Sequence, residues 1–249
     1  MDNTVLGRMN PYPGIRSHPA MWLPIAYHSG RSDTWRDHSS FALWLMAQLR
    51  PKVFVELGVY AGDSYCVFCQ AVTAFDLPTR CFGVDDWTGE FCRQSGFPTG
   101  NHDGNLEDLR LYHDAKYGAF STLLPMTFDE ARPYFDEIPI NLLHIDGCHL
   151  TSAVRHDYEN WLPALADDGV VLFHDTNISG EGLGVVEFWR DLRQHHPSFE
   201  FRHSCGLGVI APKSVPPVLT DLFAASEFDI AYIEQLSFQA SAGSIPGAP

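Results

Sequence analysis

VFVELGVYAGDS, residues 53–64, joins an apolar run to two glycines and the start of a helix. Residues 52–57 form a short run that is rich in Val and Phe, and such a run predicts a buried strand. Gly58 and Gly62 allow the chain to turn tightly and a ligand to approach the backbone closely. Ser64 falls in the first turn of the following helix, where backbone N–H groups lack partners. In open α/β sheets, a strand–turn–helix unit of this kind binds nucleotide-like ligands.

The composition excludes several classes of partner. The chain has 249 residues, 16 of them basic and 31 acidic, for a net charge of −15. Such a charge disfavours binding to nucleic acid and to anionic lipid. There is no run of 18 apolar residues, so no membrane span is expected, and residues 1–14 show no secretory signal. The six cysteines form no secreted-domain framework, and Cys66 and Cys69 are expected in a helical core rather than at zinc. A cytoplasmic location is therefore expected.

Strand and helix signals alternate along the chain. Strands are expected over residues 52–57, 81–85, 121–124, 140–146, 170–174, 199–203 and 207–211. Helices are expected over residues 35–49, 63–75, 105–117, 127–137, 151–165, 183–195 and 219–236. The alternation predicts an α/β fold with a Rossmann-like, seven-stranded, mostly parallel sheet, helices on both faces and a C-terminal antiparallel hairpin.

The same pattern divides the chain into three parts. Residues 1–50 are expected to form an N-terminal arm and a helix, and residues 51–212 the core. Within the core, the long connection over residues 86–118 is interpreted as a lid over the active site, because connections of this length are usually functional or disordered. Residues 213–249 are expected to form a C-terminal helix and a tail that is disordered from Ser237.

The candidate functional residues follow the strands, at the edge where ligands bind in open α/β sheets. Asp85 ends the second strand, where an acid can accept hydrogen bonds from a ribose diol; the adjacent Asp86 is an alternative that the sequence leaves open. Asp146 and Asp175 end the fourth and fifth strands. Two carboxylates there could hold Mg²⁺ rather than Zn²⁺, which prefers His and Cys. His149, three residues after Asp146, could take a proton from a substrate hydroxyl.

The string E-x-G-x-x-x-G-x-S resembles the first motif of class I S-adenosylmethionine (SAM) methyltransferases, and it lacks the G-x-G-x-x-G spacing of dinucleotide sites. The resemblance implies SAM as the cofactor and a set of residues around it. The methionine part would lie at the first turn, the ribose after the second strand and the adenine after the third. The implied residues are Glu56, Gly58, Tyr60, Gly62, Ser64, Asp85, Asp86, Trp87, Thr127, Phe128 and Asp146.

A closer resemblance is to bacterial methyltransferases encoded with or fused to glycosyltransferases, and to macrolide-sugar O-methyltransferases. It covers roughly residues 53–211 and is carried by residues 109–135, 143–147, 154–157 and 171–176. In the metal-dependent enzymes an acid has a histidine three residues on, so the resemblance implies Asp146 as first metal ligand, His149 as base and Asp175 as second ligand. Thr176 stands where a third ligand is expected. His113, on the expected lid, and His174 are the candidates for substrate contact, with His174 alternatively orienting Asp175.

The resemblance implies SAM-dependent O-methylation of a sugar-bearing or other small-molecule acceptor, as in the biosynthesis of natural products. A homo-oligomer is left open. One alternative is a metal-independent or N-directed methyltransferase. Alternatives from other classes are a dinucleotide-dependent oxidoreductase and a non-catalytic partner protein with the same fold.

Overall fold

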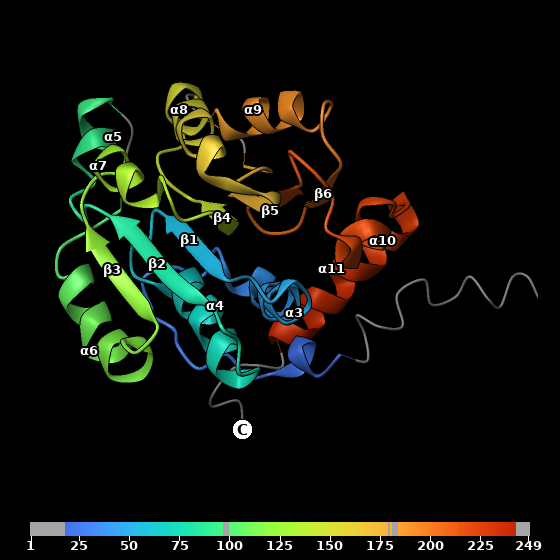
Figure 1. Ribbon diagram of the computed structural model, residues 1–249, viewed down its shortest axis with the longest axis horizontal. Coiled ribbons are helices and arrows are strands. Elements are labelled where there is room, and N and C mark those ends of the chain that lie inside the picture. The colour runs from blue at the N-terminus through green and yellow to red at the C-terminus, as the bar shows by residue number, and fades with distance from the viewer. Residues whose placement is uncertain (1–17, 97–99, 179, 181–183, 243–249) are drawn as a thin grey trace, which may run out of the picture.

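The computed structural model describes residues 18–96, 100–178, 180 and 184–242 (Figure 1). Its sheet contains β1 (Val53–Leu57), β2 (Arg80–Asp85), β3 (Ser121–Pro125), β4 (Ile140–Ile145), β5 (Leu165–His174), β6 (Ser198–Phe201) and β7 (Leu207–Ile210). The α-helices are α3 (Ser39–Leu49), α4 (Asp63–Ala74), α5 (Glu90–Gln94), α6 (Asn105–Tyr117), α7 (Phe128–Ala131), α8 (Thr151–Trp161), α9 (Val185–Leu192), α10 (Thr220–Phe223) and α11 (Glu227–Ala242). Short 3₁₀-helices are η1 (Pro19–Trp22), η2 (Arg36–His38), η3 (Arg132–Phe135), η4 (Leu162–Ala164) and η5 (Pro217–Leu219).

The strand order is β3-β2-β1-β4-β5-β7-β6. β1 pairs in parallel with β2 and β4, whereas β7 pairs antiparallel with both β5 and β6. The strand order reverses direction at β1, so β1 and β4 flank the switch point at which such sheets bind ligands. The predicted seven-stranded, mostly parallel fold with an antiparallel hairpin is confirmed.

The sheet is covered by helices on both faces, and β1 shows how. Its five residues are all buried because alternate side chains enter two different cores. Phe54 packs in a core with residues of α3, α4 and α11, whereas Val55 packs with residues of α8 and α9. This two-sided burial explains why the sequence of β1 is an almost continuous apolar run.

Several elements differ from the sequence prediction: the helices expected over 35–49, 127–137 and 151–165 each combine an α-helix with a short 3₁₀-helix, and β5 and the C-terminal helix differ most. β5 begins at Leu165 rather than near residue 170, because Leu165 pairs with Ile140 before a register irregularity. The single helix expected over 219–236 is instead α10 and α11. Ser226 directly precedes α11, and its side chain and backbone N–H both donate to Asp229 Oδ2, at 2.6 and 2.9 Å.

α11 extends to Ala242, so the expected start of a disordered tail at Ser237 is wrong. Ser237 is fully buried, and its hydroxyl donates to the carbonyl of Asp37 at 2.9 Å. The expected tail beyond 242, the first 17 residues of the arm and the expected start of a helix at 183 lie outside the described residues.

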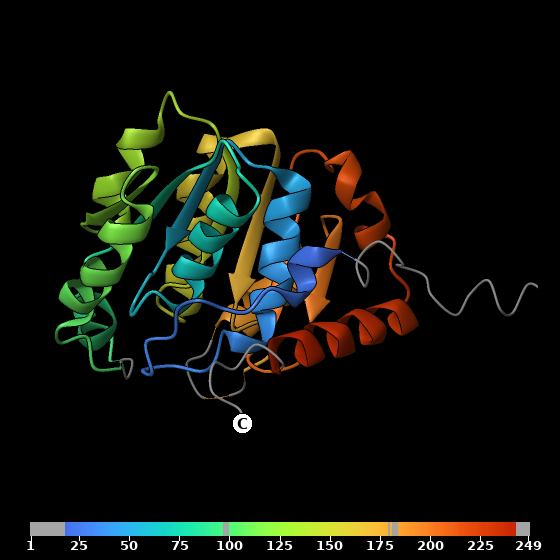
Figure 2. The ribbon, with the colours of Figure 1, turned by 90° about the horizontal axis from the view of Figure 1, so that it is seen from below.

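The N-terminal arm packs against the body of the protein. Met21 of η1 is 1% exposed and belongs to the same core as α3 and α4. The Tyr27 hydroxyl donates to the carbonyl of Ala61, and the backbone N–H of Ser29 to Asp63 at 2.7 Å. Figure 2 shows the arm crossing beneath the sheet beside α11. The arm is thus tied to the glycine turn at the end of β1.

Among the described helices, none has the length and apolar character needed to span a membrane.

Candidate active site

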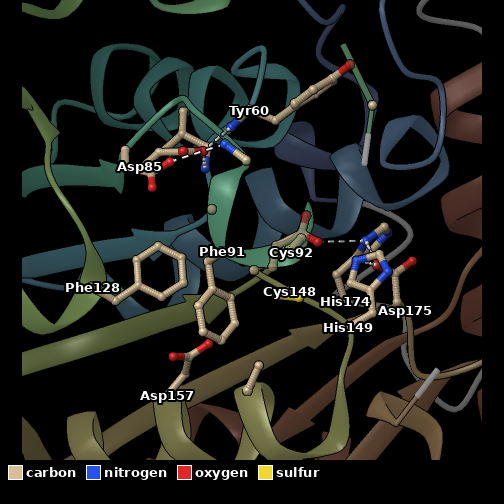
Figure 3. A pocket seen from close by; sticks show the side chains of 18 of the residues that line it. Tyr60, Asp85, Phe91, Cys92, Phe128, Cys148, His149, Asp157, His174 and Asp175 are labelled. Atoms are coloured by element: carbon tan, nitrogen blue, oxygen red, sulfur yellow. Dashed lines mark hydrogen bonds and ion pairs between the residues drawn. The ribbon is translucent and has the colours of Figure 1, made fainter. Parts of the chain in front are cut away.

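A cavity of about 930 Å³ opens at the carboxyl ends of the parallel strands (Figure 3). Most of the residues proposed from the sequence line it, although they come from five separate segments, each at the carboxyl end of a parallel strand. Those lining residues are Gly58, Tyr60, Ser64, Asp85, Asp86, Thr127, Phe128, Asp146, His149, His174 and Asp175. The volume lies within the usual range for small-molecule and cofactor sites.

Gly58 occupies a position that no other residue could take without rearrangement. Its φ is +90°, and a Cβ added there would lie 2.1 Å from the carbonyl oxygen of Asp146. The backbone is held on both sides, because the N–H of Gly58 donates to Val84 and that of Asp146 to Leu57. The first glycine therefore lets β1 and β4 end side by side, which brings Asp146 to the cavity.

Asp85 organises the same turn. Its carboxylate accepts backbone hydrogen bonds from Val59 at 2.9 Å, Tyr60 at 2.8 Å and Trp87 at 2.6 Å (Figure 3). Burial raises the pKa of Asp85, and the hydrogen bonds from Tyr60 and Trp87 oppose that rise. Asp86, which also lines the cavity, instead accepts bonds from Thr88 and Gly89 within its own loop. Asp85 is thus the acid that connects β2 to the glycine turn.

Three residues proposed for SAM binding lie behind the cavity wall. Gly62 packs against α6, since a Cβ there would meet Leu109 at 2.5 Å. Trp87 donates its indole N–H to the carbonyl of Tyr60 at 2.7 Å. Glu56 is fully buried and accepts a 2.6 Å bond from Ser64. The structure gives these residues positions that support the glycine turn.

A buried polar chain links Glu56 to the arm. Glu56 Oε2 lies 3.0 Å from His144 Nδ1, and His144 Nε2 accepts the indole N–H of Trp35 at 3.3 Å. Burial raises the pKa of Glu56, and His144 opposes that rise. Trp35 also lines the cavity. The sequence placed it only at the start of a helix.

Replacing Trp35 by Phe is expected to lower the free energy of unfolding by about 1 kcal/mol beyond the cost of the smaller ring, because the bond to His144 is lost. Trp161→Phe is the control: Trp161 is equally buried, and its indole N–H has no partner among the described residues. Urea unfolding of the two variants measures the difference. Equal losses in both would show that the Trp35–His144 bond does not stabilise the fold.

Asp146, His149, His174 and Asp175 form a compact cluster at the ends of β4 and β5, and Figure 3 shows the last three of them. His149 Nε2 lies 2.7 Å from Asp175 Oδ2. His174 Nδ1 lies 3.2 Å from Asp146 Oδ1 and 3.3 Å from Asp175 Oδ2. His174 is 3% exposed, and besides the two acids its ring packs near those of Trp35 and His38, with ring centroids 6.2 and 5.8 Å away. The cluster unites residues that the sequence separates by up to 29 positions.

The charges in this cluster stabilise one another. Burial disfavours the imidazolium form of His149, but Asp175 and Asp146 outweigh it and raise the pKa of His149. Burial also disfavours the charged form of His174, but Asp146, and to a lesser extent Asp175, outweigh this effect and raise the pKa of His174. Burial would raise the pKa of Asp175, but hydrogen bonds from His149 and His174 lower it. Asp175 is therefore ionised under ordinary conditions.

The geometry changes the expected metal-binding set. One ligand atom from each of Asp146, His149 and Asp175 lies within 4.8 Å of the others, so these three residues could hold one ion. Thr176, expected as a third ligand, is 3% exposed and does not line the cavity, and its hydroxyl lies near Gly206, where a Cβ would be 2.6 Å from it. Two carboxylate donors fit a hard divalent cation, and the imidazole also admits borderline metals.

His113 does not contact the cavity. It is 1% exposed, and its Nε2 lies 2.7 Å from the hydroxyl of Ser121 on β3. α6 is thus a sheet-covering helix, and the expectation that His113 contacts substrate from a lid is wrong. Within the described part of the predicted lid, α5 and its flanks line the cavity through Gly89, Phe91 and Cys92.

Several cavity residues carry no recognisable signal in the sequence. Arg31, Ser32 and Thr34 reach it from the arm, and Phe91 and Cys92 from α5. The position of each of these residues in the cavity depends on a contact between distant segments rather than on a local motif.

Two further cavity residues, Asp157 and Cys148, have shifted pKa values. Burial raises the pKa of Asp157 on α8 to about 7. A hydrogen bond with the Cys92 thiol lowers the pKa of Cys148 to about 6. Both groups lie in the same part of the cavity as Phe91 and Phe128 (Figure 3).

Comparison with known proteins agrees with this architecture. Residues 55–176 match a family described as a methyltransferase domain. An uncharacterised protein of Sinorhizobium fredii, y4gI, is 42% identical over 176 residues, which are 71% of this chain and 19% of the relative. The chain thus spans about a fifth of the length of that curated relative.

Solved structures share the fold at low sequence identity. The SAH-bound methyltransferase PaMTH1 of Podospora anserina is 13% identical, with a TM-score of 0.53 over 86% of this chain and 96% of its own. CalS11, a TDP-rhamnose 3′-O-methyltransferase of calicheamicin biosynthesis, is 20% identical, with a TM-score of 0.51 over 69% of this chain and 76% of its own. At these identities the likeness shows the fold alone.

Proposed function

We propose that the protein is a class I, SAM-dependent enzyme that methylates a hydroxyl group of a small or sugar-bearing molecule; the match of residues 55–176 to a family described as a methyltransferase domain supports this. The observation that carries the proposal is the single cavity that joins the glycine turn of β1 to the acid–histidine cluster of β4 and β5. The end of the cavity at the glycine turn suits a cofactor, and the end at the acid–histidine cluster suits an acceptor that must lose a proton.

On the cofactor side, the chain supplies a rigid turn and an acid. Asp85 fixes the N–H groups of Val59 and Tyr60, and its remaining acceptor capacity faces the cavity, where a ribose diol could donate. Thr127 and Phe128 flank the cavity beyond β3 and are the proposed adenine contacts. SAM bound there would supply an electrophilic methyl group, and the turn would hold it in a fixed orientation.

On the acceptor side, His149 is the proposed general base. Asp175 orients its Nε2 edge at 2.7 Å, and His174 holds Asp175 in turn. A neutral imidazole can accept the proton of a hydroxyl as the oxygen is methylated. Alignment of oxygen and methyl group in the cavity would contribute much of the rate. Arg31, Ser32 and Thr34 of the arm are the proposed acceptor contacts.

Calorimetric titration with SAM and with SAH tests the first half of this proposal, and transfer of a labelled methyl group to an acceptor panel tests the second. The panel should include nucleotide-linked and simple deoxysugars, since CalS11 acts on TDP-rhamnose, together with phenolic acceptors and amines. We expect SAM binding and hydroxyl methylation. Binding of NAD in place of SAM, or transfer to amines alone, would contradict the proposal.

A divalent cation, Mg²⁺, is proposed between Asp146 and Asp175. Such an ion would supply a positive charge that favours an acceptor alkoxide. We expect saturating Mg²⁺ to raise the melting temperature of chelator-treated protein by about 2–4 °C, for a stabilisation of about 1 kcal/mol. Asp175→Asn should abolish the shift. A larger response to Zn²⁺ than to Mg²⁺ would favour His149 as a ligand, and methyl transfer that survives exhaustive chelation would exclude an essential ion.

A further inference from the structure

Two free cysteines meet at the cavity wall. Cys92 and Cys148 both line the cavity (Figure 3) and are half-buried. A hydrogen bond joins their side chains. They are 56 positions apart in the sequence. Cys66, Cys69 and Cys81 are buried in the core, and Cys205 is half-buried beside Asp175. The contact between Cys92 and Cys148 has no role in the fold or in methyl transfer as described above.

The two cysteines stand on elements of very different rigidity. Cys148 lies in the loop between β4 and α8, which is held by backbone bonds from Asp146 to Leu57 at 2.8 Å and from Gly184 to His149 at 2.7 Å. Cys92 lies on α5, a five-residue helix with no buried residue. Elements with little buried surface open locally at low cost. α5 can therefore move relative to a fixed loop, and the thiol contact bridges the two.

We propose that Cys92 and Cys148 form a reversible disulfide that locks α5 against the wall of the SAM cavity. α5 and its flanks supply the cavity residues Gly89 and Phe91 as well as Cys92. A covalent bond between this segment and the β4–α8 loop prevents the wall from opening. Exchange of a ligand through the cavity then slows, which makes the thiol pair a site of oxidative control.

The chemistry requires a two-electron oxidant, for which a peroxide suffices. One thiol sulfur attacks a peroxide oxygen, the O–O bond breaks, and a sulfenic acid and one water form. The second thiol attacks the sulfenic sulfur, the S–S bond forms, the S–O bond breaks, and a second water leaves. Two thiols and one hydrogen peroxide thus give one disulfide and two waters. A dithiol reductant reverses the reaction by exchange.

The pairing itself is tested without any ligand. The full chain is treated with hydrogen peroxide and digested without reduction, and the peptides are identified by mass spectrometry. We expect a cross-linked peptide pair joining Cys92 to Cys148 that disappears on reduction. Hydrogen exchange should show slower exchange of the α5 amides in the oxidised protein. A disulfide to another cysteine, or over-oxidised Cys148 without a cross-link, would overturn the proposal.

The functional effect is tested with SAH as the probe, and this part rests on the proposed function. Stopped-flow binding should show association and dissociation slowed by about tenfold or more after oxidation, and restored by reductant. Cys92→Ser should remove the response to peroxide, whereas Cys66→Ser, at a core thiol outside the pair, should retain it. Equal rates of SAH association and dissociation in cross-linked and reduced protein would refute the proposal that the disulfide locks α5. If the reduced protein binds no SAH, the proposed function fails, while the cross-link and the exchange data still decide the pairing.

Discussion

His149→Ala is expected to lower turnover by roughly 10²–10⁴-fold while SAM affinity stays close to that of the wild type. The imidazole lies 2.7 Å from Asp175 at the cavity wall, and its loss removes the proposed proton acceptor without touching the glycine turn. Turnover with an identified acceptor and calorimetry with SAM, measured on one folded preparation, separate the two effects.

An alternative role for His149, as cap of α8, predicts a different outcome. A lost cap would lower stability by about 1 kcal/mol and leave turnover largely intact. In the structure the cap residue is Leu150 and no side-chain cap bond is present, while His149 pairs with Asp175. His196→Ala, outside the cavity, is the matched control and should keep near-wild-type turnover. Near-wild-type turnover in His149→Ala would eliminate the base assignment.

Asp85→Ala is expected to weaken SAM binding by about 1.5–3 kcal/mol, or roughly 10–150-fold. Two causes act together. The variant loses the proposed acceptor for the ribose, and it leaves the N–H groups of Val59, Tyr60 and Trp87 without their carboxylate. Calorimetric titration with SAM measures the loss, and the melting temperature reports any damage to the turn.

Two variants refine this test. Asp85→Asn keeps one oxygen acceptor for the backbone and should lose less affinity than Asp85→Ala. Asp86→Ala removes the neighbouring acid, whose bonds stay within its own loop, and should change SAM affinity little. Loss of affinity in Asp86→Ala with none in Asp85→Ala would transfer the ribose role to Asp86.

The sheet and its glycine turn were predictable because their signals are local. An apolar run, a turn residue and a helical period each occupy a few consecutive positions, so β1 and α6 follow the predicted limits closely. The Asp146, His149 and Asp175 cluster was predictable for a related reason. Carboxyl ends of neighbouring parallel strands meet at one edge, so residues after β4 and β5 had to lie close together.

Contacts that depend on distant segments were not predictable. Trp35 reaches the cavity only because the arm folds back along α4, and nothing in its local pattern encodes that path. His113 has the polarity of a surface residue, but Ser121 provides a buried partner for it. Thr176 follows Asp175 in sequence, yet Asp175 has a φ of +63°, and Thr176 is directed toward Gly206 rather than toward the acids.

The path of the N-terminal arm bears on how this protein can be trimmed for recombinant work. The methyltransferase match begins at residue 55, and a chain shortened to that boundary would lack α3, Met21 and Trp35. Their buried apolar surface belongs to the same core as α4 and α11, so the remaining fragment would expose that face and become prone to aggregation. Expression from residue 18 or earlier keeps the face covered and the cavity wall complete.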